Sequence, residues 1–111
     1  MQQTPDDVIT RLQDIIRESS KGADALFASE MKLAEAELKY DSEYQRLFIE
    51  AGGTVADRQA VAKLQTAQLA FDVAVAKAEV NRVKIKMKQL SDAGTFTAVI
   101  AKQIELVWKH P

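Results

Sequence analysis

Four basic residues occur within the seven positions 82–88, and a further lysine precedes them by five residues. Cations that displace the counterions condensed on phosphates supply most of the sequence-independent affinity of proteins for nucleic acids. On a helix, Lys77, Lys84 and Lys88 would lie along one side, and Arg82 and Lys86 would lie on the other. The segment therefore predicts a nucleic-acid interface made by Lys77, Arg82, Lys84, Lys86 and Lys88.

Charge pairing inside the chain is the alternative use of these cations. An antiparallel hairpin that turns at Gly52-Gly53 would bring acidic residues of the first half level with them. The expected neighbours are Asp24 with Arg82, Glu30 with Lys77, and Asp14 and Glu18 with the segment 84–88.

The chain has few of the residue types that catalysis and metal binding commonly use. The 111 residues include no cysteine, one histidine (His110) and no glycine-rich phosphate loop. Three carboxylates, Glu30, Glu37 and Asp41, lie within an apolar arc, but no histidine accompanies them and we expect them to face lysines. We therefore expect no enzyme, no catalytic residue, no metal and no cofactor.

Charge is balanced overall but divided along the chain. There are 15 basic and 16 acidic residues, yet residues 1–51 carry a net charge of -5 and residues 52–111 a net charge of +4. With 47% hydrophobic residues, the composition suits one folded domain of residues 1–111. The acidic start is no secretory signal, and no apolar run approaches the roughly 18 residues of a membrane span. We expect a cytoplasmic protein with no membrane partner.

Helical signals dominate, so we expect an all-α fold. Thr4 and Thr54 are suited to cap helices, and the glycine pair 52–53 is suited to end one. A kink or short break is expected at Ser19–Gly22, and a break is expected at Ser91–Gly94. The predicted helices cover residues 5–20, 23–51, 55–91 and 96–109, with Phe96, Ile100, Ile104, Val107 and Trp108 on one stripe of the last.

The predicted helix 55–91 contains no glycine or proline and would be about 55 Å long, which indicates an elongated antiparallel hairpin with short terminal helices. A helical wheel places two apolar stripes on it. The first consists of Leu69, Val73, Ala76, Val80, Val83, Met87 and Leu90. The second lies on nearly the opposite side and consists of Leu64, Ala67, Phe71, Ala74, Ala78 and Ile85.

A helix with two apolar faces must bury both, and the preceding helix can cover one. In the preceding helix, an apolar or aromatic residue recurs every seven positions, a spacing that is typical of coiled coils. These residues are Leu26, Leu33, Tyr40 and Leu47. The second face requires either another copy of the chain or terminal segments folded back into a four-helix monomer. For a homo-oligomer, the predicted interface residues are Leu64, Phe71, Ala74, Ala78 and Ile85.

Four aromatic residues could stack on bases, but their helical spacing favours packing in the core. They are Tyr40, Tyr44, Phe48 and Phe71.

Residues 23–90 resemble small helical proteins of bacteriophage recombination and replication gene clusters, including UvsY-type recombination mediators. The resemblance is carried by the run Ala34–Glu37 leading to Tyr40 and Tyr44, by Gly52–Ala60, and by the alanine-rich helix ending in basic residues and Leu90-Ser91. It implies a non-enzymatic protein that assembles into rings, binds single-stranded DNA and helps to load a recombinase. The strongly basic C-terminal region of those mediators is absent here, which is a departure from the family. The resemblance implies that Lys77, Arg82, Lys84, Lys86 and Lys88 are the phosphate contacts.

Two functions follow as expectations. The first is an oligomeric accessory protein of recombination that binds single-stranded DNA through its Lys/Arg stripe. The second is an adaptor or inhibitor that binds another protein through an apolar or acidic helix face and does not bind nucleic acid.

Overall fold

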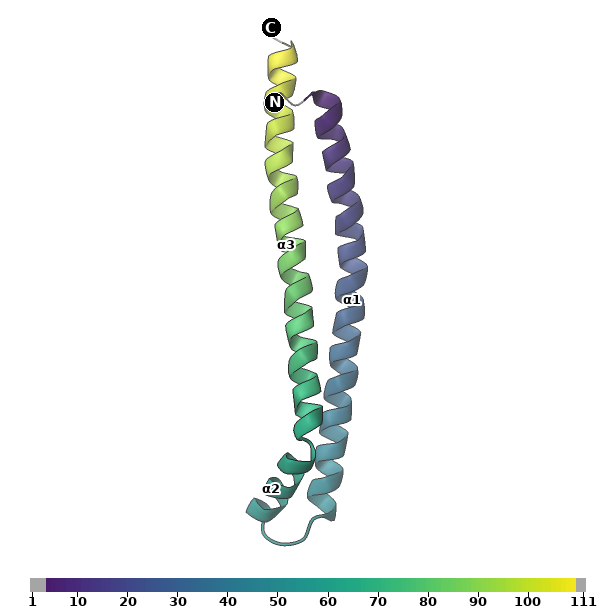
Figure 1. Ribbon diagram of the computed structural model, residues 1–111, viewed down its shortest axis with the longest axis vertical. Helices are drawn as coiled ribbons and strands as arrows, with labels where there is room; N and C mark the ends of the chain where they lie inside the picture. The colour runs from purple at the N-terminus through teal and green to yellow at the C-terminus, as the bar shows by residue number, and fades with distance from the viewer. Residues whose placement is uncertain (1–3, 110–111) are drawn as a thin grey trace. The chain divides into compact units, whose positions relative to one another are not determined.

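Three helices make up the computed structural model, which describes residues 4–109 (Figure 1). Helix α1 spans Pro5–Glu50, α2 spans Val55–Gln65 and α3 spans Ala67–Lys109. This part of the chain contains no strand, so the predicted all-α class is confirmed. The described residues divide into two compact units, residues 27–82 and residues 4–26 with 83–109.

Threonine caps begin α1 and α2, as the sequence predicts. The Oγ1 of Thr54 accepts a hydrogen bond from the backbone N–H of Asp57 at 3.2 Å, and the Asp57 carboxylate accepts one from the N–H of Thr54 at 3.1 Å. Thr4 and Asp7 make the same reciprocal pair at 3.2 Å in both directions. Before Thr54, Gly53 has a φ of 98°, a conformation that favours glycine.

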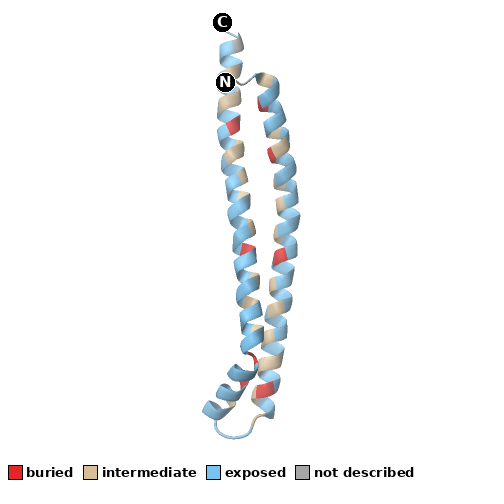
Figure 2. Cartoon of the chain, viewed as in Figure 1, coloured by how far each residue is buried: buried red, intermediate tan, exposed pale blue. Residues whose placement is uncertain are grey.

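In the unit of residues 27–82, the second half of α1 and the first part of α3 lie antiparallel (Figure 1). Side chains of both helices line a common groove. The residues between these helices are buried or half-buried and recur at alternating intervals of three and four, which keeps one stripe facing the partner helix (Figure 2). On α1 they include Ser29, Leu33, Ala36, Tyr40 and Leu47, and on α3 Leu69, Val73, Ala76 and Val80.

In the other unit, the first part of α1 packs against the last part of α3 with the same spacing. Val8, Ile15 and Thr97 are buried there. Gly22 lies against Met87, and Gly94 lies against Ile15. A turn centred on Gly52-Gly53 predicts Val83 opposite Gly22, whereas Gly22 lies against Met87, so the observed register differs from the expected one by about one helical turn.

The predicted breaks at Ser19–Gly22 and Ser91–Gly94 are wrong, because α1 and α3 continue through them. Ser19, Gly22 and Gly94 lie half-buried on the inner stripes. The two glycines leave room for the facing side chains of Met87 and Ile15, so they serve packing rather than termination. The described residues accordingly form no four-helix core.

The predicted continuous helix 55–91 is also wrong, because it is interrupted at Thr66, between α2 and α3 (Figure 1). Thr66 has φ -103° and ψ 10°, and its Oγ1 donates a hydrogen bond of 2.6 Å to the carbonyl of Ala62. A threonine that bonds to the carbonyl four residues earlier often bends a helix. Thr66 is 1% exposed, so the bend lies in the packed part of its unit.

Candidate nucleic-acid interface on helix α3

The five predicted phosphate contacts all lie on α3, and all five are exposed. Lys77 and Arg82 belong to the unit of residues 27–82, whereas Lys84, Lys86 and Lys88 belong to the other unit. The intervening stripe Ala76, Val80, Val83 and Met87 is buried or half-buried against α1, which fixes the helix and directs the basic side chains to solvent.

Two of the five cations form long ion pairs with acidic residues of the same helix. Arg82 Nε lies 3.7 Å from Glu79 Oε2, and Lys88 Nζ lies 3.6 Å from Asp92 Oδ2. The side chains of Arg82 and Lys88 are 82% and 80% exposed, and ion pairs of this kind contribute about 0–1 kcal/mol. A phosphate could therefore replace either carboxylate at little cost.

The expected pairing of α1 acids with α3 bases does not occur. Each ion pair that the described residues form joins two residues of the same helix. Glu30 makes none with Lys77, and Asp14 pairs with Arg17 rather than with the segment 84–88. Within residues 4–109, Lys77, Lys84 and Lys86 have no ion-pair partner.

Repulsion between these cations favours an anionic ligand. Arg82 and Lys86 are four residues apart, as are Lys84 and Lys88, and like charges at this spacing destabilise a helix by roughly 0.2–0.5 kcal/mol per pair. A bound polyanion would remove this penalty. The arrangement suits electrostatic contact with a phosphate backbone, because all the groups are flexible exposed cations rather than a shaped pocket for a base.

The second apolar stripe remains uncovered by the described chain. Leu64 is 79% exposed, Phe71 62% and Ile85 60%, and Ala67, Ala74 and Ala78 are exposed as well. Leu64 lies on α2 and the other five lie on α3. The first stripe, from Leu69 to Leu90, is buried or half-buried as predicted.

The aromatic residues divide between packing and exposure. Tyr40, Tyr44 and Phe48 are half-buried, with ring centroids 6.0 Å apart for the first pair and 6.5 Å for the second. Exposed Phe71 departs from the expected core position.

No metal site is found among the described residues, in which no three carboxylate or histidine side chains gather. Glu30, Glu37 and Asp41 are exposed on α1. His110 and the side chain of Trp108 lie outside what the structure describes. Over residues 4–109, no helix has the length and apolarity needed to span a membrane.

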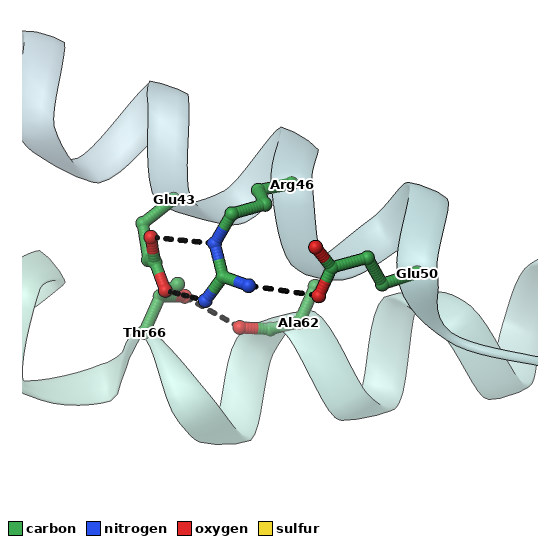
Figure 3. Close-up of polar contacts among 5 residues, drawn as sticks. All are labelled: Glu43, Arg46, Glu50, Ala62 and Thr66. Atoms are coloured by element: carbon green, nitrogen blue, oxygen red, sulfur yellow. Dashed lines mark hydrogen bonds and ion pairs between the residues drawn. The ribbon is translucent and has the colours of Figure 1, made fainter.

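A charge cluster that was not predicted from the sequence lies at the end of α1 (Figure 3). Arg46 donates hydrogen bonds to Glu43 on one side and to Glu50 at 2.7 Å on the other, and the same view shows Ala62 of α2 and Thr66, the residue that follows α2. The hydrogen bond from Arg46 lowers the pKa of Glu43 below its ordinary 4.5, and the two carboxylates raise the pKa of Arg46. The spacing Glu-x-x-Arg-x-x-x-Glu is the signal that could have revealed it.

Comparison of the chain with models of known protein families, with curated proteins and with solved structures finds no match.

Proposed function

We propose that the chain is a non-enzymatic accessory protein that binds single-stranded DNA through Lys77, Arg82, Lys84, Lys86 and Lys88. The observation that carries this proposal is five exposed cations within one segment of α3, three of them without an ion-pair partner among residues 4–109. Binding would be electrostatic and largely independent of base order, because cations that contact phosphates carry no sequence information.

The proposal includes a continuous antiparallel hairpin of α1 and α3, of coiled-coil type, whose copies associate through the second apolar stripe. Support comes from the three-and-four spacing of the inner residues in each unit and from the exposure of Leu64, Phe71 and Ile85. Association would align the basic segments of several copies along one strand. The resemblance of residues 23–90 to recombination mediators suggests that such an assembly presents DNA to a recombinase.

Fluorescence anisotropy of a labelled oligothymidine at low salt tests the DNA proposal. We expect Lys84→Glu, Lys86→Glu and Lys88→Glu, made together, to abolish binding with helical circular dichroism unchanged. The matched control is Arg11→Glu, Lys21→Glu and Lys39→Glu, which changes the net charge equally at exposed positions of α1. Undiminished binding by the first variant, or equal loss in both, would overturn the proposal.

An adaptor that binds another protein is the second candidate function. The exposed apolar stripe and the net charge of -5 on residues 1–51 favour it, because large exposed apolar patches commonly mark protein interaction sites. Stable capture of one cellular protein, with no affinity for the oligothymidine at low salt, would favour this function over DNA binding.

A further inference from the structure

Two grooves lie where the helices meet in the unit of residues 4–26 with 83–109, which we call the terminal unit. Ile9 of α1 and Lys109 of α3 line one of them. Arg11 of α1 and Ile100 of α3 line the other. Buried Val8 lines both grooves, so they lie on opposite sides of the seam between the helices.

Helical spacing extends the first of these sides along both helices. On α3, Lys102 precedes Lys109 by one heptad, Lys88 precedes Lys102 by two heptads, and Lys84 lies about one turn before Lys88. On α1, steps of three and four residues from Ile9 follow the same side. We call this side of the terminal unit the lysine side. Its α3 cations are Lys84, Lys88, Lys102 and Lys109, and its α1 residues from position 8 onwards are Ile9, Gln13, Ile16, Ser20 and Ala23.

Two of the four lysines on this side have acidic partners on their own helix. Lys109 Nζ lies 2.6 Å from Glu105 Oε1, and Lys88 Nζ lies 3.6 Å from Asp92 Oδ2. Each of these four side chains is more than half exposed, so water screens both pairs. An incoming phosphate can therefore replace either carboxylate.

The other two lysines lack such partners. Lys84 and Lys102 are exposed and form no ion pair with any residue in the range 4–109. Between residues 8 and 26, every carboxylate of α1 falls at a helical position off the lysine side. Asp6 lies at the end of this side, in the first turn of α1, where it complements the positive end of the helix.

The opposite side of the terminal unit has as many carboxylates as cations. They are Asp7, Asp14 and Glu18 against Arg11, Lys21 and Lys86. A polyanion lying along the terminal unit is therefore attracted to the lysine side more strongly than to the opposite side.

Polar groups of α1 border the interval between Lys88 and Lys102. The register set by the two glycines inside the helices places Ser20 and Gln13 level with this interval, and both are exposed. A serine hydroxyl and a glutamine amide each donate hydrogen bonds to phosphate oxygens. Groups that can bind phosphate thus continue along this side between the two lysines.

We propose that the phosphate contacts of α3 continue along the lysine side beyond Lys88 to Lys102, with Gln13 and Ser20 of α1 as further donors. Lys84 and Lys102 are about 27 Å apart along the helix, so one ligand that contacts both must be an extended polyanion. The ligand is single-stranded DNA, so this inference rests on the proposed function and adds contacts outside residues 77–88.

The salt dependence of oligothymidine binding, measured by fluorescence anisotropy, tests the role of Lys102. In the plot of the logarithm of the binding constant against the logarithm of salt concentration, we expect Lys102→Gln to reduce the slope by about 0.7, because one counterion fewer is released. Lys21→Gln is the matched control, because it removes the same charge from an exposed position on the opposite side. Lys102→Arg retains the charge, so both it and Lys21→Gln should keep the slope of the natural chain. Equal slopes for Lys102→Gln and Lys21→Gln would overturn the inference.

Acetylation of the natural chain by an N-hydroxysuccinimide ester, followed by mass spectrometry, locates the contacts directly. We expect bound oligothymidine to slow the acetylation of Lys84, Lys88 and Lys102 and to leave Lys21 unchanged. Protection of Lys84 and Lys88 without Lys102 would overturn the inference and leave the proposed function standing. No affinity of the natural chain for the oligothymidine at low salt would overturn both.

Discussion

Gly22 of α1 lies against Met87 of α3, so that a β-carbon on Gly22 would be 3.2 Å from Met87 Cγ. In the same unit, a β-carbon on Gly94 would lie 3.4 Å from Cγ2 of Ile15. Both glycines are interior to helices, where glycine costs roughly 1 kcal/mol relative to alanine. The two positions therefore share the same gain in helix propensity and differ in the room available for a methyl group.

Gly94→Ala should stabilise the protein by about 0.5–1 kcal/mol, because its β-carbon meets Ile15 at an ordinary contact distance. Gly22→Ala should yield less, because Met87 must move to admit the new methyl group. Urea unfolding followed by circular dichroism measures the difference. A larger gain for Gly22→Ala than for Gly94→Ala would contradict the packing described here.

Gly53→Ala should destabilise the protein by roughly 1 kcal/mol or more, since a φ of 98° is unfavourable for a residue with a side chain. The new β-carbon would also lie 2.6 Å from the Asp57 carboxylate that caps α2. Gly52→Ala is the matched control, because nothing lies within 4 Å of its β-carbon. The midpoint of thermal unfolding should decrease for Gly53→Ala alone, and equal midpoints for the two variants would refute the turn geometry.

Helix starts and the inner face of α3 could be predicted from the sequence because their causes are local. Thr54 and Asp57 have the residue types and spacing of a capping box, and the stripe from Leu69 to Leu90 has helical periodicity. Helix continuity could not be predicted in the same way. Gly22 and Gly94 are helix breakers by propensity, and only the side chains opposite them, Met87 and Ile15, show that close packing is their role.

The interruption at Thr66 and the partners of the charged residues could not be predicted from the sequence either. No glycine or proline marks the end of α2, and the bend is associated with the hydrogen bond from Thr66 to Ala62 in a buried position. The two halves of the chain have opposite charge, which favoured pairing across helices. The exposed side chains instead reach partners three or four residues away on their own helix, as Arg82 does with Glu79.

Thr66→Ala should cost about 1–2 kcal/mol, because it removes a buried methyl group and the hydroxyl that bonds to Ala62 at 2.6 Å. Thr95 provides the matched control. Its hydroxyl donates a similar 3.1 Å hydrogen bond to the Ser91 carbonyl from an exposed position, so Thr95→Ala should be neutral or slightly stabilising. Equal losses in chemical denaturation would show that burial of Thr66 contributes nothing.

The Glu43 carboxylate should titrate below 4.5 in the folded protein, since the hydrogen bond from Arg46 lowers its pKa. A lowered folded-state pKa stabilises the fold at higher pH, and that contribution is lost as the pH falls below 4.5 through the folded value. Arg46→Gln should return the pKa of Glu43 towards 4.5, as measured by carboxyl carbon NMR. Glu105, whose pKa is lowered by Lys109, is the internal control and should not change, and an unchanged Glu43 would contradict the role of Arg46.

Affinity for single-stranded DNA should fall steeply with salt if the five α3 cations each contact a phosphate. Five contacts give a slope of roughly -3.5 in the logarithm of the binding constant against the logarithm of salt concentration, or about a 100-fold loss between 50 and 200 mM. Neutralising Lys84 and Lys86 to Gln should reduce the slope by about 1.4, because two counterions fewer are released. The same change at Lys32 and Lys39, which are exposed on α1, should leave the slope unaltered. Oligothymidine and a mixed-sequence strand of equal length should bind alike, and a slope near zero or a strong preference between them would exclude the phosphate-contact mechanism.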